Sequence, residues 1–427
     1  MSALARSLRA STNVSRAAAA RTATRAFSAS AARKDWDFTT VEKPGSLYNF
    51  TDEENLLRET VRKYATEVIE PKVREMDEAE VMDKDVIQGL FDNGLMGIET
   101  PEQYDGAGMS FTSAIIAVEE IARVDPSVAV LVDVHNTLVN TVFRHHASDA
   151  VKEKWLPGLA TNKVGSFCLT EPGAGSDAFS LQTTAKLDPS GDFYLLNGTK
   201  MWISNSGEAE TFLVFANVDP SKGYKGISAF VISKDMGVEI AKKEQKLGIR
   251  ASSTCVLNFD NIKIPKENVV GEIGKGYKYA IEILNEGRIG IAAQMIGLAQ
   301  GAFDKAITYA YQRKQFGKAV GDFQGMGFQF AEVATEIEAA KLMTYNAARL
   351  KEEGRNFTKE AAMAKYYAST VAMKAAGQAI EWCGGVGFTR DTGVEKYWRD
   401  SKIGAIYEGT NNIQLETIAK HLKKQYA

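Results

Sequence analysis

The fold of this chain is decided by the stretch Phe167-Cys168-Leu169-Thr170-Glu171-Pro172-Gly173-Ala174-Gly175-Ser176-Asp177. Together with Ala178 it fits the letters G-x-G-x-x-A, the fingerprint of a dinucleotide-binding βαβ unit. That fingerprint requires a strand before the glycines and a helix after them, whereas Pro172 precedes them here and β-type sequence follows. We therefore expect a glycine-rich loop in an all-β module, where the backbone approaches a ligand closely and Thr170 and Ser176 offer hydroxyls. A plain turn is the alternative.

The hydrophobic pattern on either side of this loop divides the chain into three zones. Residues 50–163 have helical periodicity, residues 164–273 consist of short β-type runs separated by turn residues, and residues 274–427 return to long helices with few breakers. The pattern therefore predicts an α+β protein with an N-terminal helical domain, a middle β domain and a C-terminal helical domain.

Several local signals can be tested against the structure. Thr51-Asp52-Glu53-Glu54 reads as a capping box, and the helix that it opens should end before Pro71. Residues 193–196 read as a strand that ends at the turn Asn197-Gly198. The long C-terminal helices are expected over residues 279–314, 324–350 and 358–382.

The first 33 residues differ in composition from the rest of the chain. They contain no acidic residue, many Ala and Ser, and six arginines: Arg6, Arg9, Arg16, Arg21, Arg25 and Arg33. This is the composition of a mitochondrial transit peptide, with cleavage expected near Phe27-Ser28 or a few residues beyond. A nucleic-acid-binding arm is the alternative, but it would normally carry lysines. Removing the six arginines lowers the formal net charge from −3 to −9, which argues against binding to nucleic acid or to anionic membranes.

The bulk composition excludes several other classes of protein. With 44% hydrophobic and 25% charged residues the chain reads as an ordinary globular protein of two or three domains. No apolar run approaches the length of a membrane span, so we expect no membrane insertion. The three cysteines lack a CxxC spacing and the four histidines lack a ligand spacing, so neither disulfides nor a metal site is expected.

A candidate catalytic residue lies in a second segment, Ile406-Tyr407-Glu408-Gly409-Thr410-Asn411-Asn412-Ile413-Gln414. It forms a polar break between two apolar runs of helical pattern, which puts Glu408 at a corner between helices. A carboxylate held in such a corner is partly desolvated, and desolvation raises its proton affinity toward that of a useful general base. A solvated loop glutamate is the alternative.

These two segments resemble signatures of the acyl-CoA dehydrogenase family. The other signatures follow in family order: Lys200-Met201-Trp202-Ile203-Ser204-Asn205, Arg313-Lys314-Gln315-Phe316-Gly317, Gln324 and Glu381-Trp382-Cys383-Gly384-Gly385. The resemblance covers about residues 50–425, and ordered motifs of this kind are specific together although each is weak alone. It implies a helical domain, a β-barrel or sandwich and a helical bundle in that order. It also implies FAD as cofactor, α,β-dehydrogenation of an acyl-CoA, and transfer of electrons to an electron-transferring flavoprotein.

The resemblance also implies roles for individual residues, with Glu408 as the catalytic base. The residues expected to bind FAD are Phe167, Leu169, Thr170, Ser176, Trp202, Ile203, Ser204, Arg313, Gln324, Glu381, Gly384, Gly385, Thr410 and Asn412. The residues expected to bind the acyl-CoA are Ser176, Tyr224, Tyr277, Asn285, Glu286, Gly287, Arg288 and Gly409. Glu381 departs from the glutamine of several relatives, and an ionised carboxylate cannot donate the amide hydrogen bond. Arg313 is expected to reach the FAD of a neighbouring subunit, which implies an oligomer, by family habit a homotetramer.

The segment Asn285-Glu286-Gly287-Arg288-Ile289-Gly290-Ile291-Ala292-Ala293-Gln294 bears on the substrate. With residues 132–137 and 364–369 it resembles most closely the mitochondrial members of the family that act on short, 2-methyl-branched substrates. Isovaleryl and long-chain members place their base immediately before the arginine, where this chain has Gly287, so the base must be Glu408. We expect Gly287 to leave room for the 2-methyl branch of 2-methylbutanoyl-CoA or isobutanoyl-CoA.

The resemblance places the enzyme in the mitochondrial matrix, in branched-chain amino acid and fatty acid catabolism. Three other functions stay open from the sequence. A straight-chain butanoyl-CoA dehydrogenase shares the glycine before the arginine. An oxidase of the same fold would pass electrons to oxygen, and an assembly scaffold would be non-catalytic. The intact Glu408 and the complete flavin motifs count against the scaffold.

Overall fold

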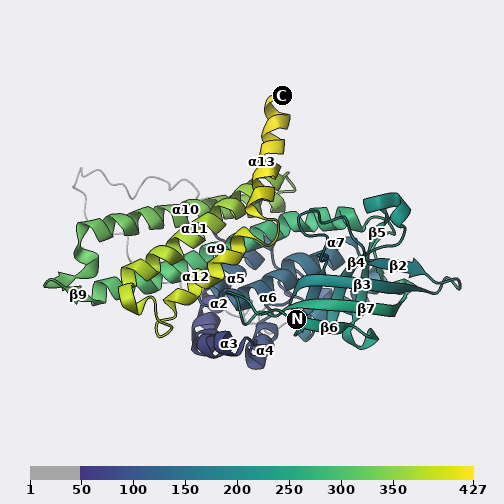
Figure 1. Ribbon diagram of the computed structural model, residues 1–427, viewed down its shortest axis with the longest axis horizontal. Helices are drawn as coiled ribbons and strands as arrows, with labels where there is room; N and C mark the ends of the chain where they lie inside the picture. The colour runs from purple at the N-terminus through teal and green to yellow at the C-terminus, as the bar shows by residue number, and fades with distance from the viewer. Residues whose placement is uncertain (1–48) are drawn as a thin grey trace, which may run out of the picture.

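The computed structural model describes residues 49–427. The arginine-rich segment 1–33 and its expected cleavage site lie outside the described residues. A layer of long helices forms one end of the molecule and a twisted sheet forms the other, with the N-terminal helices packed beneath their junction (Figure 1). None of the helices within residues 49–427 is long and apolar enough to cross a membrane.

The N-terminal part is helical, as its periodicity predicts. Its elements are α2 (Asp52–Tyr64), η2 (Ala65–Ile69), η3 (Glu70–Lys72), α3 (Val73–Ala79), α4 (Lys84–Asp92), η4 (Glu102–Tyr104), α5 (Phe111–Ala122), α6 (Pro126–Asp133), η5 (Val134–Asn140), α7 (Thr141–His146) and α8 (Asp149–Thr161). The capping box is confirmed: Glu54 N–H donates to Thr51 Oγ1 at 3.2 Å, and Thr51 N–H donates to Glu54 Oε2 at 2.9 Å. Every residue of α5, α6 and η5 is buried.

The α-helix that the capping box opens ends at Tyr64, before Pro71 as expected, but the chain does not leave the helical conformation there. The chain stays helical through the π-helical turn η2 and the 3₁₀ turn η3, which contains Pro71, and continues into α3. Proline is tolerated here because it occupies the first turn of a new short helix, where its missing N–H would have no intrahelical acceptor.

The middle part forms one sheet of eight strands. The strands are β1 (Gly165–Cys168), β2 (Thr184–Leu187), β3 (Phe193–Ser204), β4 (Thr211–Asn217), β5 (Ile227–Ser233), β6 (Glu239–Lys243), β7 (Thr254–Pro265) and β8 (Val269–Val270). Their order is β6-β7-β3-β2-β4-β5-β8, with β1 parallel to β4. The sheet has its own apolar core, to which Phe212, Phe230 and Leu257 contribute.

The turn expected at Asn197-Gly198 is not formed, because β3 runs through it. The register against β7 shifts here, because Leu196 pairs with Ile262 and Gly198 with Phe259. Two residues of β7, Asp260 and Asn261, therefore lie opposite Asn197, as in a β-bulge of β7. Gly198 has a φ of 147°, and a Cβ there would lie 2.7 Å from Thr183 Cα. The glycine is therefore required by a close approach of β3 to the segment before β2, and not by a hairpin.

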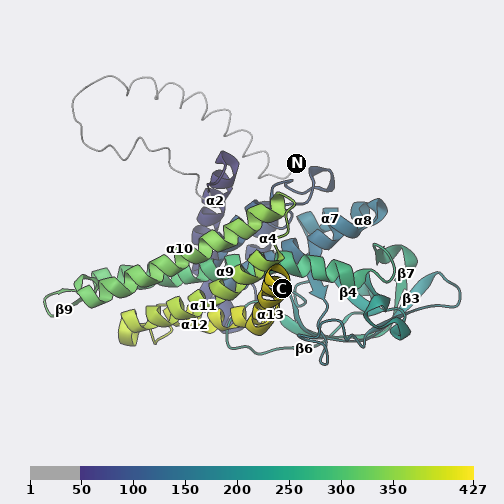
Figure 2. The ribbon, with the colours of Figure 1, turned by 90° about the horizontal axis from the view of Figure 1, so that it is seen from above.

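The C-terminal part is a bundle of long helices that lie side by side in two perpendicular views (Figures 1 and 2). Its elements are α9 (Gly276–Gln312), β9 (Lys314–Gln315), β10 (Lys318–Ala319), η9 (Val320–Asp322), α10 (Gln324–Glu352), α11 (Thr358–Cys383), η10 (Gly384–Val386), α12 (Val394–Ser401), η11 (Lys402–Ala405) and α13 (Asn411–Tyr426). The predicted long helices are confirmed. The 37-residue α9 extends from the sheet to the β9–β10 hairpin, roughly 55 Å, and so links the two ends of the molecule.

Candidate active site

The corner between η11 and α13 holds Glu408 in a left-handed backbone conformation, with φ of 52° at Glu408 and 83° at Gly409. Its carbonyls are fixed by side chains from two helices. Gln414 Nε2 donates to Glu408 O at 3.0 Å and to Gly409 O at 2.9 Å, and Lys365 Nζ on α11 donates to Gly409 O at 2.7 Å. No acceptor within residues 49–427 pairs with the Glu408 N–H. The corner therefore fixes its carbonyl groups and leaves this N–H available.

The Glu408 carboxylate lies directly against Gly287 on α9. A Cβ at Gly287 would lie 2.9 Å from Glu408 Oε2 and 2.8 Å from Leu138 Cδ2. We expected the missing side chain to leave room for a branched acyl group; the structure shows instead that Glu408 and Leu138 occupy this space. Gly287 is therefore the seat of the carboxylate. Glu408 is half-buried as a residue, but its Oε2 atom is buried and has no hydrogen-bond partner among the described residues.

Burial raises the pKa of Glu408 to about 7, and the positive charges of Lys365 and then Arg288 oppose that rise. Neither cation makes a contact ion pair with Glu408 within residues 49–427, and Arg288 Nη1 donates instead to Asn285 Oδ1 at 2.9 Å. A carboxyl group whose pKa lies near neutrality, with an unpaired oxygen, can act as a general base.

The structure brings the two expected flavin segments together at one edge of the sheet. Met201 N–H donates to Thr170 O at 2.9 Å. The buried Lys200 Nζ donates to Leu169 O and to Glu171 Oε1, both at 2.8 Å, and Ser166 Oγ donates to Ser204 O at 2.7 Å. These contacts lock the loop after β1 onto the end of β3.

Trp202 is presented outward by this arrangement. It lies where the β3–β7 register shifts between Lys200 and Ile203, has a φ of 59°, and is 54% exposed. Such a conformation costs about 1–3 kcal/mol in a non-glycine residue. No hydrogen bond within residues 49–427 uses the hydroxyl of Thr170 or Ser204. An exposed aromatic ring beside two unpaired hydroxyls fits a flat, polar aromatic cofactor such as a flavin. Phe167 and Ile203 pack against the apolar residues of the sheet, and the tilted rings of Phe167 and Phe215 have centroids 5.1 Å apart.

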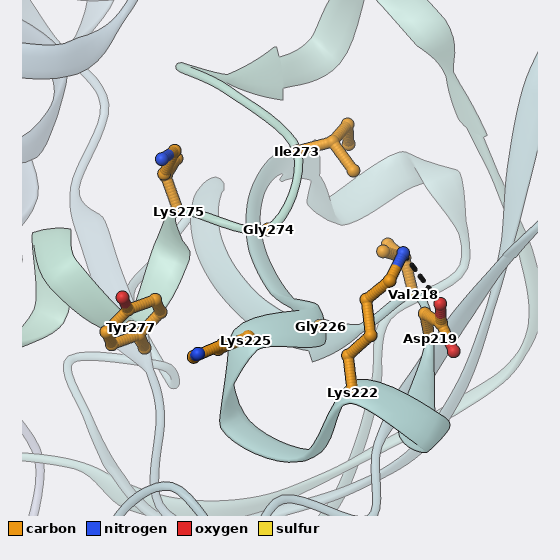
Figure 3. Close-up of a pocket in the computed structure, with 9 residues that line it drawn as sticks. All are labelled: Val218, Asp219, Lys222, Lys225, Gly226, Ile273, Gly274, Lys275 and Tyr277. Carbon is orange, nitrogen blue, oxygen red and sulfur yellow. Dashed lines mark ion pairs between the residues drawn. The ribbon is translucent and has the colours of Figure 1, made fainter.

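The residues expected to hold the CoA lie on the sheet side of α9. Ser176 is exposed on the glycine-rich loop. Tyr224 and Tyr277 meet edge to face with ring centroids 5.0 Å apart. Beside them lies a cavity of about 290 Å³ at the N-terminus of α9, lined by Val218, Asp219, Lys222, Lys225, Gly226, Ile273, Gly274, Lys275 and Tyr277 (Figure 3). Lys222 pairs with Asp219 at 2.9 Å, whereas Lys225 and Lys275 make no ion pair with any described residue.

The remaining expected substrate residues have structural partners. Asn285 Nδ2 donates to Ile281 O at 3.0 Å and its Oδ1 accepts from Arg288. Glu286 is 7% exposed and forms an ion pair with Lys351 of α10 at 3.3 Å. These contacts hold α9 in place around Gly287 and favour a supporting role for Asn285 and Glu286.

A third group of expected cofactor residues lies at the far end of the bundle. Arg313, Gln324, Glu381, Gly384 and Gly385 are all exposed there. Along α9, Arg313 is about 38 Å from Arg288, which faces Glu408. One dinucleotide cannot contact both ends of this helix. Thr410 and Asn412 remain beside Glu408, where Thr410 Oγ1 accepts the N-cap bond from Ile413 N–H at 3.4 Å.

Comparison with known proteins agrees with this geometry. Three family models match consecutive parts of the chain: the acyl-CoA dehydrogenase N-terminal domain over residues 51–163, the middle domain over 166–262 and the C-terminal domain over 274–423. The chain belongs to the acyl-CoA dehydrogenase family. The succession of a helical domain, a sheet domain and a second helical domain is therefore the acyl-CoA dehydrogenase fold. Acyl-CoA dehydrogenases depend on FAD.

Individual relatives are similar over nearly the whole of the described chain. The rat short/branched chain specific acyl-CoA dehydrogenase is 58% identical over 89% of this chain and 88% of its own. The rat short-chain specific acyl-CoA dehydrogenase is 42% identical over 87% and 90%. A chain solved in work on the electron transferring flavoprotein of Acidaminococcus fermentans has a TM-score of 0.86 and 41% identity over 88% and 99%. An acyl-CoA dehydrogenase complexed with FAD from Bacillus anthracis has a TM-score of 0.83 and 30% identity over 89% and 68%.

Two features of this acyl-CoA dehydrogenase site were missed by sequence reasoning. Lys365 approaches Gly409 across 44 positions of sequence, and the only signal was a lone lysine among the alanines of a helix, with Ala361, Ala362, Ala364 and Ala368 around it. Lys225 and Lys275 belong to different loops, and no local pattern brings them to one cavity.

Proposed function

We propose that this chain oxidises short branched acyl-CoA thioesters, chiefly 2-methylbutanoyl-CoA and isobutanoyl-CoA, to trans-2-enoyl-CoA products. The observation that carries the proposal is the unpaired Glu408 carboxylate seated on Gly287. The relatives support the choice of substrate, since identity to the short/branched chain specific enzyme of rat is 58% and to the short-chain specific enzyme of the same organism 42%. The straight-chain butanoyl-CoA remains the competing substrate.

In this proposal Glu408 removes the proton from the α carbon of the thioester and ends the step as a carboxylic acid. The α C–H is acidic enough only while the thioester carbonyl is polarised, and the free Glu408 N–H can donate the hydrogen bond that does this. FAD, when bound, supplies the oxidant that takes the hydride from the β carbon. The strained corner therefore serves both proton removal and polarisation of the thioester carbonyl, because the carboxylate and the N–H donor belong to one residue.

Two sets of residues fit the FAD. Thr170, Trp202 and Ser204 form the flavin surface, supported by Phe167, Leu169, Ser176, Ile203, Thr410 and Asn412. We assign Arg313, Gln324, Glu381, Gly384 and Gly385 to the dinucleotide of a second copy, because roughly 38 Å of α9 separates them from the Glu408 end of their own chain. A guanidinium such as that of Arg313 can bind a pyrophosphate bidentately.

The cavity at the N-terminus of α9 fits the nucleotide end of the CoA. Tyr277 lies roughly 15 Å before Gly287 along the helix, so a ligand with its thioester at Glu408 would have its nucleotide near Tyr224 and Tyr277. Phosphate groups there would meet the unpaired ammonium groups of Lys225 and Lys275 (Figure 3) and the positive end of the helix dipole.

The assembly and the cellular setting complete the proposal. We infer a homotetramer in the mitochondrial matrix, with residues 1–33 removed on import and with domains at 50–163, 164–273 and 274–427. Exposed aromatic residues at the far end of the bundle support association between copies: Phe316 is 94% exposed and Phe388 is 82% exposed. Electrons would pass to an electron-transferring flavoprotein, in keeping with the Acidaminococcus fermentans relative.

One experiment tests the proposal as a whole. The purified holoenzyme is titrated anaerobically with butanoyl-CoA, isobutanoyl-CoA, 2-methylbutanoyl-CoA and isovaleryl-CoA while the flavin absorbance is followed. We expect bleaching at stoichiometric 2-methylbutanoyl-CoA and isobutanoyl-CoA. Stronger bleaching by butanoyl-CoA would make the chain a straight-chain dehydrogenase, and no bleaching by any thioester would reject the activity itself.

A further inference from the structure

Lys365 on α11 is one of three lysines buried in residues 49–427, and its surroundings differ from those of the other two. Lys200 contacts Glu171 at 2.8 Å, and Lys396 contacts Asp125 at 2.9 Å and Asp400 at 2.6 Å. Lys365 is 0% exposed yet contacts no carboxylate among the described residues. A buried ammonium without a contact partner is costly, so its retention needs another explanation.

The hydrogen bond of Lys365 is directed at the strained corner. Its ammonium donates to Gly409 O at 2.7 Å, the residue directly after Glu408. Left-handed φ values at Glu408 and Gly409 are unfavourable for the glutamate and persist only where neighbours hold them. One turn later on α11, Ser369 Oγ donates to Asn411 Oδ1 at 3.0 Å, which ties the start of α13 to the same helix.

The charge of Lys365 faces the Glu408 carboxylate without touching it. The ionisable groups that act on Glu408 are Lys365 from α11 and Arg288 from α9, with Asp133 at the end of α6 and the adjacent Tyr407 also within electrostatic range. Burial raises the pKa of Asp133 well above its usual value, and the negative charge of Glu408 adds to this rise. A contact ion pair would occupy the oxygen that must receive a proton, whereas a cation at a distance stabilises the carboxylate and leaves that oxygen free.

We propose that Lys365 is a positioning residue for the base: its hydrogen bond to Gly409 holds the corner, and its positive charge keeps Glu408 in the carboxylate form that receives the α proton. Glu408 and Lys365 therefore carry opposite charges that are both buried but are not in contact with each other. This inference rests on the proposed function, because it presumes that Glu408 is the base.

The pKa values agree with a mutual dependence of the two groups. Burial lowers the pKa of Lys365 to about 7, with Glu408 opposing this and Arg288 adding to it. The Glu408 carboxylate likewise has its pKa held at about 7 by Lys365 against the larger effect of burial. Removing the ammonium should therefore raise the pKa of Glu408, and the acid limb of the rate profile should move to higher pH.

Three variants of the holoenzyme separate the charge from the hydrogen bond. Lys365→Gln keeps a donor for Gly409 without the charge, Lys365→Met removes both, and Lys365→Arg keeps both. In Lys365→Gln and Lys365→Met we expect the acid limb of the pH profile of kcat/KM to move to higher pH by about one unit or more. The rate at neutral pH should then fall about tenfold and recover at higher pH. In Lys365→Arg the acid limb of the kcat/KM profile should stay near the pH at which the parent enzyme shows it. Ser369→Ala is the matched control, since it removes a neighbouring contact to α13 without changing charge, and its limb should not move.

The inference is overturned if the acid limb stays in place in both Lys365→Gln and Lys365→Met. A pH-independent loss of flavin or folding in all three variants, Arg included, would make Lys365 a structural residue and reject the inference as well. The Glu408→Gln variant tests the proposed function separately, because near-normal turnover there would reject the base whatever Lys365 does.

Discussion

At the scale of single residues, the seat of the Glu408 carboxylate depends on the absence of a side chain at Gly287. The positions that a Cβ would occupy are taken by Glu408 Oε2 and Leu138 Cδ2. The carboxylate can therefore lie against α9, and its Oε2 remains without a hydrogen-bond partner among the described residues. Because the pKa of Glu408 is about 7, and only the ionised form accepts a proton, kcat/KM should rise with pH through that region.

Glu408→Gln should keep the fold and the flavin but lose proton abstraction. The amide is nearly isosteric with the carboxylate, yet it cannot accept the α proton, so the rate of flavin reduction should fall about 10²–10⁴-fold. Rapid anaerobic mixing with 2-methylbutanoyl-CoA measures that rate, and the flavin spectrum and thermal melting serve as checks on folding. A variant that still turns over at nearly the normal rate would remove Glu408 from the role of base.

Gly287→Glu should damage the site in two ways. Any side chain at this position displaces the Glu408 carboxylate from its seat, and a second carboxylate beside the first makes ionisation of both unfavourable. A displacement of about 1 Å can cost on the order of 10²-fold in rate. Because Glu408 and Leu138 adjoin Gly287, this loss should be similar for branched and straight substrates.

Gly287→Ala is the control for this prediction, because it adds the Cβ without the charge. The kcat/KM values for butanoyl-CoA and 2-methylbutanoyl-CoA are compared in both variants. A ratio of the two values that changes in Gly287→Glu would contradict this and show that Gly287 also shapes the acyl pocket.

At the scale of elements, α9 connects all parts of the site. Its N-terminus lines the lysine cavity, its middle seats Glu408 on Gly287, and its end carries Arg313. As a long rigid helix, α9 would therefore fix the spacing between the nucleotide end and the thioester end of a CoA bound as we propose. Because the packing of Glu286 against Lys351 holds α9 in the bundle, the same contacts that stabilise the fold also set this spacing.

Lys225→Ala and Lys275→Ala should weaken binding of the CoA nucleotide without altering the chemical step. We expect KM to rise about two- to fivefold for each, with kcat nearly unchanged, because a partly exposed ion pair contributes about 0.2–1 kcal/mol. Steady-state kinetics with 2-methylbutanoyl-CoA and with its 3′-dephospho analogue measure the effect.

Lys222→Ala is the matched control, because its ammonium already pairs with Asp219 at 2.9 Å. It should raise KM less than the other two. If the penalty of Lys225→Ala and Lys275→Ala is the same for the dephospho analogue, these lysines do not contact the 3′-phosphate. If KM does not change at all, the cavity lies off the path of the CoA.

Elements with a long periodic pattern were predictable from the sequence, and short-range signals were less reliable. The helices α9, α10 and α11 follow from many repeated positions, and the Glu408 corner follows from the polar break between two such patterns. Asn197-Gly198 and Pro71 carry strong turn and stop signals, yet β3 runs straight through the first, opposite a bulge in β7, and the second lies in a 3₁₀ turn. Lys365 shows the limit most clearly, because its contact with Gly409 depends on how α11 packs against the corner.

At the scale of the whole molecule, the two groups of residues that we propose to bind FAD lie at opposite ends of the molecule. The proposed flavin surface around Trp202 lies at the sheet, and the exposed residues around Arg313 lie about 38 Å further along α9 than the Glu408 region. Two copies arranged so that one bundle end meets the other copy's sheet would complete each site. The exposed aromatic residues at this end include Phe316 and Phe388, which association would cover.

Arg313→Ala should therefore weaken both the retention of FAD and the association of subunits. Loss of a charge-assisted hydrogen bond to a phosphate costs about 1.5–3 kcal/mol, which corresponds to roughly a 10- to 100-fold weaker affinity for FAD. The ratio of flavin to protein after gel filtration, together with the elution volume, measures both effects in one experiment. Arg313→Lys should recover part of the affinity, because it restores the charge but not the bidentate geometry.

Arg355→Ala is the control, because Arg355 is another exposed arginine, in the loop between α10 and α11, whose only ion pair within residues 49–427 is with Glu353, at 3.2 Å. It should leave both the flavin content and the elution volume unchanged. A decisive extension mixes Arg313→Ala with Glu408→Gln under conditions that exchange subunits. Each parent variant is defective. If Arg313 binds the FAD of the neighbouring copy, some sites in mixed oligomers combine an intact Glu408 with an intact Arg313. The activity of the mixture should then exceed that of either parent variant. No gain on mixing, with flavin content in Arg313→Ala equal to that of the parent chain, would leave Arg313 a surface charge.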